Sequence, residues 1–319
     1  MKKILLATTA VIATAGMAAA EVTFGGLGRF GVHYSEANKD KPEGDTNLES
    51  RLRLQVDMST QSDAGIELGG RFRAQYDDKV GKATDPAKWS GGRLHASMGP
   101  VRIEVGNVSD ALDSMPGLYL PTTSVGTGLN YMDPGMVALN DFRGFSSNGP
   151  GVVNGINFVY SMGDLNLLVN SNDGSEADDS DDHVSGYISY KINGWQIALA
   201  GLDSQDDKNI LVGTVTGDLG FAGVGLSYAN NENAGGTAAD PDDVGKVRLY
   251  GHIPVGMATE VVVWGANQSD PVMDSTDDGG SFGIDVEHHL GGGVTAVAGV
   301  SDSIGDNATQ ASAGIFFKF

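Results

Sequence analysis

Residues 48–59 read LESRLRLQVDMS and alternate almost strictly between apolar and polar side chains. Successive side chains of a β-strand point to opposite faces, so this two-residue period predicts a strand with one apolar and one hydrophilic face. The apolar face carries Leu48, Leu52, Leu54, Val56 and Met58, and the other carries Arg51, Arg53, Gln55 and Asp57. Residues 66–77, IELGGRFRAQYD, repeat the pattern.

The same period recurs along most of the chain and predicts about sixteen strands. Most are close to the ~9–11 residues that a tilted strand needs to cross a bilayer. The predicted strands lie at 22–34, 48–59, 66–77, 93–98, 101–106, 152–162, 164–172, 183–192, 195–203, 208–217, 220–229, 245–253, 257–268, 281–289, 294–301 and 308–319.

Short and long connections take turns between these strands. Tight, glycine-containing turns are expected at 62–65, 99–100, 163–164, 193–194, 217–220, 254–256 and 290–293. Longer segments are expected at 35–46, 78–90, 107–150, 173–182, 203–207, 230–243, 269–280 and 302–307. The alternation predicts strands that run up and down, with all tight turns at one end, as in an outer-membrane barrel.

The segment 107–148 lacks the alternation and is far longer than the usual ~4–6-residue connection. Its apolar side chains argue against a solvated, disordered stretch. These are Leu118, Tyr119, Leu120, Tyr131, Met132, Phe142 and Phe145. We expect the segment to fold inward and to narrow a channel, with Ser109 capping a short helical turn that ends at Pro116.

The first twenty residues have the form of a secretion signal. Lys2 and Lys3 precede a short apolar run, and Ala18, Ala19 and Ala20 form a small-residue cleavage site. We therefore expect a signal peptide at 1–20 and one mature domain at 21–319; a membrane anchor would need a longer run. Removing both lysines changes the formal net charge from −21 to −23, an acidic balance that argues against nucleic-acid binding.

Arginines dominate the hydrophilic faces of the early strands, and acids dominate the long segment. The expected basic wall consists of Arg29, Arg51, Arg53, Arg71, Arg73 and Arg93, and the expected acidic side of Asp110, Asp113, Asp133 and Asp141. A dry core would make so much like charge costly, whereas a water-filled lumen would not. The two sets predict a transverse field across a constriction. The alternative is that the acids are solvated and the arginines extend to water.

Other clusters point to no enzymatic chemistry. The chain has no cysteine and no G-x-S-x-G sequence, so no nucleophile–base pair can be placed and the protein is predicted not to be an enzyme. The minor alternative is an outer-membrane hydrolase with Ser and His on the barrel rim. The acidic run 173–182 suggests either a solvated loop or weak Ca²⁺ binding at Asp178, Asp179 and Asp181; no other cofactor is expected.

Periodicity alone does not say whether the apolar faces meet lipid or a sandwich core. Aromatic rings at both strand ends favour lipid, because barrels carry such girdles at the two interfaces. Tyr160, Tyr190 and Trp195 lie near short turns, and Tyr34, Tyr76, Tyr228 and Phe282 lie near the opposite ends. The last predicted strand ends in Phe319, with Phe317, Ile315, Ala313 and Ala311 at every second position before it.

Together, the signal, the sixteen-strand alternation, the long third loop, the arginine-rich early strands and Phe319 resemble the general diffusion porins of alphaproteobacteria (the Rhodobacter type). The resemblance implies an all-β, sixteen-stranded antiparallel transmembrane barrel in the Gram-negative outer membrane, with short periplasmic turns, long extracellular loops and an inward third loop. It also implies a homotrimer, contact with outer-membrane lipid and lipopolysaccharide, and passive diffusion of ions and small hydrophilic solutes. A substrate-selective channel and a secreted β protein without a pore are the alternatives.

Overall fold

The computed structural model describes residues 20–42, 44–78, 85–122, 154–173, 182–204, 209–237, 240–269, 279–302 and 308–319. Within these residues, seventeen β-segments form one antiparallel sheet. They are β1 (Glu21–Ser35), β2 (Thr46–Gln61), β3 (Glu67–Asp78), β4 (Asp85–Trp89), β5 (Arg93–Met98), β6 (Val101–Gly106), β7 (Asn154–Met162), β8 (Leu165–Asp173), β9 (His183–Ile192), β10 (Trp195–Ser204), β11 (Ile210–Asp218), β12 (Gly223–Thr237), β13 (Asp240–Val255), β14 (Thr259–Gln268), β15 (Gly280–Gly291), β16 (Val294–Asp302) and β17 (Thr309–Lys318).

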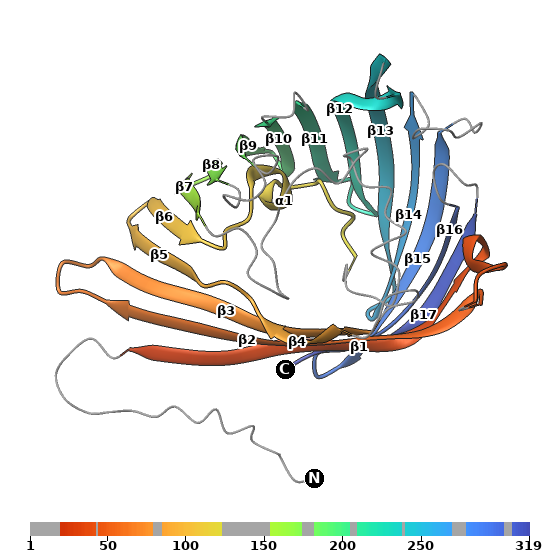
Figure 1. The fold of residues 1–319 in the computed structure, drawn as a ribbon, viewed down its shortest axis with the longest axis horizontal. Helices are drawn as coiled ribbons and strands as arrows, with labels where there is room; N and C mark the ends of the chain where they lie inside the picture. Colours follow the sequence, from red (N-terminus) through yellow and green to blue (C-terminus); the bar gives the residue numbers. More distant parts are fainter. Residues whose placement is uncertain are drawn as a thin grey trace, which may run out of the picture.

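The sheet closes on itself to form a barrel, because β17 pairs with β1. Figure 1 shows the resulting ring, with its strands in chain order around it. β4 and β5 both pair with β3, on successive stretches of it, and so occupy one position in the ring. The barrel therefore has sixteen strand positions, and the predicted fold class is confirmed.

Two predicted connections contain strand. The expected connection at 78–90 contains β4, and the expected loop at 230–243 is largely paired strand in β12 and β13. Their pairing shifts register between Asn231 and Gly235. Main-chain hydrogen bonds can extend a strand without any alternation of polar and apolar side chains. The strand extension therefore could not be recognised in this polar, glycine-rich sequence.

The short turns lie at the predicted positions or two residues from them: the turn predicted at 217–220 lies at 219–222, because Asp218 pairs with Gly223. Ile192 pairs with Trp195, so Asn193 and Gly194 form a two-residue hairpin loop, and both have positive φ (50° and 83°). Positive φ at both central residues matches the right-handed twist of the flanking strands, and Asn-Gly adopts it readily. At this end of the barrel, β9 and β10 are therefore joined by a tight turn.

Helices contribute little to the architecture. The described helices are η1 (Glu36–Asn38) and α1 (Ala111–Ser114). No helix in the described part of the chain is long and apolar enough to span a bilayer.

The strands turn their apolar faces outward. Phe24 is 71% exposed and Leu48 is 77% exposed, whereas Arg29, on the opposite face, is 3% exposed. In a sandwich the apolar faces would be packed against each other. An apolar belt around a ring with a polar interior instead matches a barrel that meets lipid, which rules out the secreted sandwich.

The rings predicted to form interfacial girdles lie on this belt, and Tyr190, Tyr228 and Phe282 are exposed. The final strand meets the first, where the amide nitrogens of Gly26 and Phe319 each donate to the other's carbonyl oxygen (2.9 and 3.2 Å). Phe316 is the exception to the polar inner face, and it is buried against Val297 and Leu27.

Candidate functional site

An arginine ladder lines the inner face of β2 and β3. Read along each strand, the inward residues have the same order, Arg-Arg-Gln-Asp, at 51–57 and again at 71–77. The antiparallel register sets Arg51 opposite Asp77, Arg53 opposite Gln75, Gln55 opposite Arg73 and Asp57 opposite Arg71. Each arginine therefore faces an acceptor across the strands, because two equal patterns run in opposite directions.

Side chains bond to each other in all four of these cross-strand pairs, which are the rungs of the ladder. The Nε of Arg53 donates to Gln75 Oε1 (2.5 Å), that of Arg73 to Gln55 Oε1 (2.7 Å) and that of Arg71 to Asp57 Oδ1 (2.5 Å). Arg51 forms the corresponding ion pair with Asp77. Within each strand, Gln55 donates to Asp57 and Gln75 to Asp77, both at 2.6 Å. The guanidinium groups are thus held in fixed orientations, as charge-assisted bonds favour.

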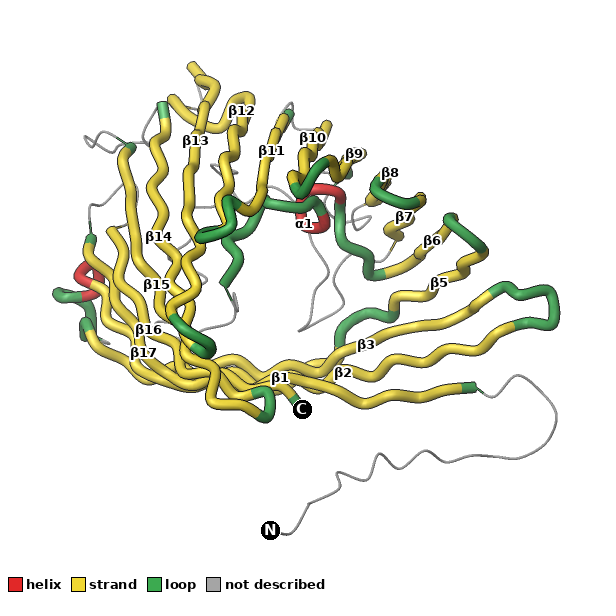
Figure 2. Tube along the Cα trace, turned by 180° about the vertical axis from the view of Figure 1, so that it is seen from behind, coloured by secondary structure: helices red, strands yellow, loops and turns green. Residues whose placement is uncertain are grey.

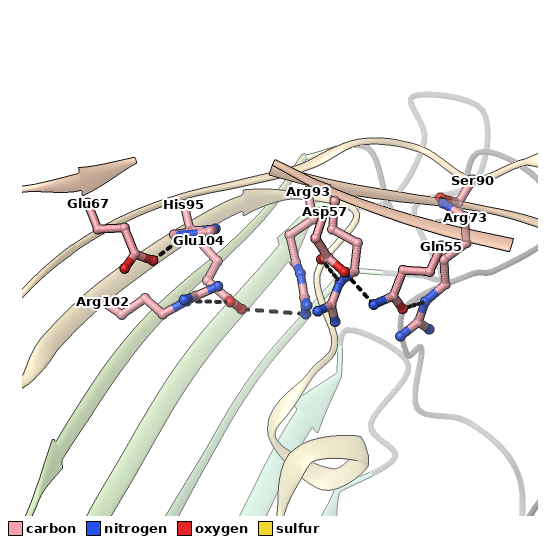
Figure 3. Close-up of polar contacts among 10 residues, drawn as sticks. Gln55, Asp57, Glu67, Arg73, Ser90, Arg93, His95, Arg102 and Glu104 are labelled. Carbon is pink, nitrogen blue, oxygen red and sulfur yellow. Dashed lines mark hydrogen bonds and ion pairs between the residues drawn. The ribbon is translucent and has the colours of Figure 1, made fainter. Parts of the chain in front are cut away.

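The ladder continues onto the neighbouring strands. On β1, Arg29 is in register with Arg51. On the other side, Glu104 of β6 accepts from Arg102 Nε at 2.9 Å and lies 3.8 Å from Arg93 Nη1 (Figure 3). All six predicted arginines therefore lie on the inner faces of β1, β2, β3 and β5. Together they form the basic wall.

A cavity of about 320 Å³ lies at the basic wall. Its lining includes Asp57, Arg71, Arg93, His95 and Arg102. The cavity thus presents fixed charges of both signs to whatever enters it. Such groups orient water and ions through their fields, without making or breaking bonds.

The described part of the long loop, residues 107–122, lies inside the barrel against the wall facing the ladder. Figures 1 and 2 show α1 within the ring beside β9 and β10. Leu112, Met115 and Leu118 are buried in an apolar cluster with the inner faces of β10, β11 and β12. The wall contributes Ala198, Ala200, Leu202, Ile210, Val212 and Ala229. The predicted inward fold of the loop is confirmed for these residues.

Hydrogen bonds from the wall hold the loop main chain. The amide of Ala111 donates to Ser185 Oγ (3.0 Å), and Thr214 Oγ1 donates to the carbonyl of Pro116 (2.7 Å). Arg248, which is fully buried, donates to the carbonyls of Gly117 (3.1 Å) and Leu118. These bonds satisfy backbone groups that no strand pairs.

Asp110 does not face the lumen as predicted. It is fully buried, and its side chain caps α1 by accepting from the amide of Asp113 (2.8 Å). The expected cap, Ser109, lies one residue earlier. A carboxylate at a helix N-terminus satisfies an amide that has no partner within the helix, which explains why Asp110 is used here.

Asp113 is the loop acid that the structure brings toward the basic wall. It is partly exposed and accepts from the hydroxyl of Tyr119 (2.9 Å). Asp133 and Asp141 lie outside the described residues, as do Asp178, Asp179 and Asp181.

The sequence interpretation missed the loop-facing anchors Ser185, Thr214 and Arg248. Each lies at an inward position of its strand, but nothing in the period distinguishes them from other inward polar residues. It also missed the repeated Arg-Arg-Gln-Asp order, although both copies are readable in the sequence. That repeat was the signal for the rungs of the ladder.

Comparisons with known proteins agree with this geometry. Residues 7–308 match the sequence profile of the family described as Gram-negative porin. The curated relatives include proteins named Porin from Fuscovulum blasticum (28% identical over 317 residues) and Rhodobacter capsulatus (26% over 330 residues). Each match covers 94% of this chain and all of the relative. An engineered variant of Rhodopseudomonas blastica porin superposes with a TM-score of 0.78 at 24% identity, over 94% of this chain and 100% of that one.

Proposed function

From the premise that this chain belongs to the Gram-negative porin family, we propose that its selectivity is set between the basic wall and the loop that faces it. As a family member it is an outer-membrane porin, a channel for ions and small hydrophilic solutes and not an enzyme. The short turns are then at the periplasmic end and the long loops outside. The position of the constriction is the part that we propose.

The observation that carries the proposal is the pairing of the ladder with an inward, wall-anchored loop. The rungs hold several guanidinium groups on one side. On the other side, Asp113 of the inward loop is partly exposed, and we propose that its carboxylate faces them across the water. Opposed charges across a narrow aqueous section orient water and favour polar solutes over apolar ones. Asp133 and Asp141 are proposed as further acids of the same side.

A bilayer experiment tests the channel and its selectivity together. The purified, folded protein should produce stepwise conductance increases in a planar bilayer, and proteoliposomes should swell with many small sugars and amino acids. We expect swelling rates to fall smoothly with solute size, since the lumen discriminates by width and charge. Swelling with a single solute class would instead identify a substrate-selective channel, and absence of conductance would contradict the proposal.

We further propose that three copies associate and that outer-membrane lipid, including lipopolysaccharide, covers the rest of the apolar belt. The belt is the support: side chains such as Phe24, Leu48 and Phe282 need an apolar partner outside the barrel. Mass measurement in detergent should give three chains per particle, and the unheated sample should migrate above the heated one on a denaturing gel. A particle of one chain would overturn the trimer.

Two proposals concern regions outside the described residues. We propose cleavage after Ala20, which N-terminal sequencing of the outer-membrane protein would show as a chain beginning at Glu21. We also propose weak Ca²⁺ binding at Asp178, Asp179 and Asp181. Ca²⁺ should raise the unfolding temperature of the parent but not of a variant with these three acids changed to asparagine.

A further inference from the structure

Four metal-binding side chains converge on the inner face near the short-turn end of β13, β14 and β15. They are His252, Glu260, Glu287 and His289. One potential ligand atom from each of Glu260, Glu287 and His289 lies within 4.8 Å of the others. His252 lies beside this group of three: its Nε2 is 3.0 Å from Glu260 Oε2, so it is the candidate for a fourth ligand. This rim cluster is separate from the ladder, and its His252 lines a cavity together with Pro121 of the described loop.

We propose that the rim cluster is a binding site for a divalent transition cation of the Zn²⁺ type. Its ligand set, two imidazoles and two carboxylates, is the mixture of nitrogen and oxygen that Zn²⁺ accepts. Ca²⁺ and Mg²⁺ prefer oxygen ligands alone, so the imidazoles favour the transition cation over them.

Three of the side chains need only rearrange locally to form a coordination sphere. Zn²⁺ binds nitrogen and carboxylate oxygen at about 2.0–2.2 Å in a tetrahedron, so neighbouring ligand atoms are about 3.4 Å apart. The ligand atoms of Glu260, Glu287 and His289 lie within 4.8 Å of one another, so they must approach by up to about 1.4 Å, which side-chain rotation can provide. Glu260 lies at the centre of the cluster, because Nε2 of His252 and Nε2 of His289 (3.7 Å) both approach its Oε2.

The second nitrogen of His289 orients its ring. Nδ1 lies 3.1 Å from Oγ1 of Thr295, a buried residue on β16. In the tautomer whose Nδ1 donates to this hydroxyl, Nε2 presents its lone pair on the side of the Glu260 carboxylate, where a cation can be bound by both groups. Hydrogen bonds at the outer nitrogen of a histidine ligand serve this orienting role in metal sites.

The position of the cluster predicts that Zn²⁺ acts differently on the channel from the two sides of the membrane. Glu260 is the second residue of β14, directly after the short turn, so the cluster lies at the periplasmic mouth. A bound divalent cation would add two positive charges and draw side chains together at this rim. Zn²⁺ should therefore lower the conductance at smaller concentrations from the periplasmic side than from the outer side.

Calorimetry with metal-free protein in detergent tests binding without relying on the channel or on its constriction. The parent should bind one Zn²⁺ per chain at this site, and His289→Ala and Glu260→Gln should each weaken that binding at least tenfold. The matched control is His288→Ala, since His288 is adjacent but points outward and bonds to Thr259 (2.8 Å). It should bind Zn²⁺ like the parent.

Each alternative outcome overturns the proposal. Equal weakening by His288→Ala and His289→Ala would show adventitious surface binding, and unchanged binding in His289→Ala and Glu260→Gln would place the ion elsewhere. Preference for Ca²⁺ over Zn²⁺ would exclude the imidazole ligands. The shift in migration of each variant on heating shows that its barrel has folded, so lost binding cannot be confused with lost structure.

Discussion

Replacing Arg71 and Arg73 by glutamate is expected to shift the ion preference of the channel strongly toward cations. Both residues belong to the ladder, where their Nε atoms bond to Asp57 and Gln55. Each substitution changes the local charge by two units, so the basic wall loses four. The new carboxylates would also lie opposite Asp57 and Gln55, which leaves Asp57 without its arginine.

The magnitude follows from Coulomb's law in water. One elementary charge acts on an ion about 8 Å away with roughly 0.5 kcal/mol at the dielectric constant of water. Salt near 0.1 M reduces this by about half or more at that distance. Four charge units then favour a cation by about 1 kcal/mol and oppose an anion by about as much, which amounts to a change of roughly tenfold or more in the permeability ratio.

The measurement is the reversal potential in a planar bilayer with a KCl gradient. The neutral pair Arg71→Gln with Arg73→Gln should give about half the shift, because it removes two charge units. Lys191→Glu is the positional control: Lys191 lies at the short-turn rim on β9, and its inversion should change the potential far less. A reversal potential unchanged by the double glutamate variant would show that the ladder does not border the narrow section.

The sequence predicts the strands well because a lipid-facing barrel imposes the two-residue period directly. The outward position of Leu48 and Leu52 and the inward position of Arg51 and Arg53 both follow from it. The sixteen strand positions follow from the two-residue period, and the inward loop follows from the one long segment that lacks this period. Strand extension in β12 and β13 was missed because main-chain pairing leaves no trace in side-chain polarity.

Site details depended on contacts that periodicity does not encode. Asp110 was predicted to face the arginines from its charge alone, yet its position at the start of α1 makes it a buried cap. Conversely, Arg248 is an inward arginine like those of the ladder, but the loop covers it completely. Which inward residue faces water and which faces the loop is decided by where the loop lies, and the loop has no repeating pattern.

Arg248 provides the second large effect that we expect. Replacing Arg248 by methionine should loosen the loop and make the open channel unstable. The guanidinium donates to the carbonyls of Gly117 and Leu118, and methionine offers them no donor. The carbonyl of Gly117 keeps a hydrogen bond from Ser227 Oγ (3.3 Å), whereas the carbonyl of Leu118 loses its donor. A buried carbonyl without a partner costs about 1–3 kcal/mol, so the anchoring of the loop weakens by about that much. At about 2 kcal/mol the population of a released loop would rise by about thirtyfold.

Single-channel recording should show this as current noise and as closures at lower voltage than in the parent, because a loop detached from β11–β13 can enter the open lumen. Thr214→Val removes the single bond to Pro116 and should act in the same direction with a smaller effect. Arg102→Met removes an inward cation from the opposite wall, where its partner is Glu104, and should leave the noise unchanged. Equal noise in the Arg102 and Arg248 variants would mean that lost lumen charge, and not a released loop, destabilises the current.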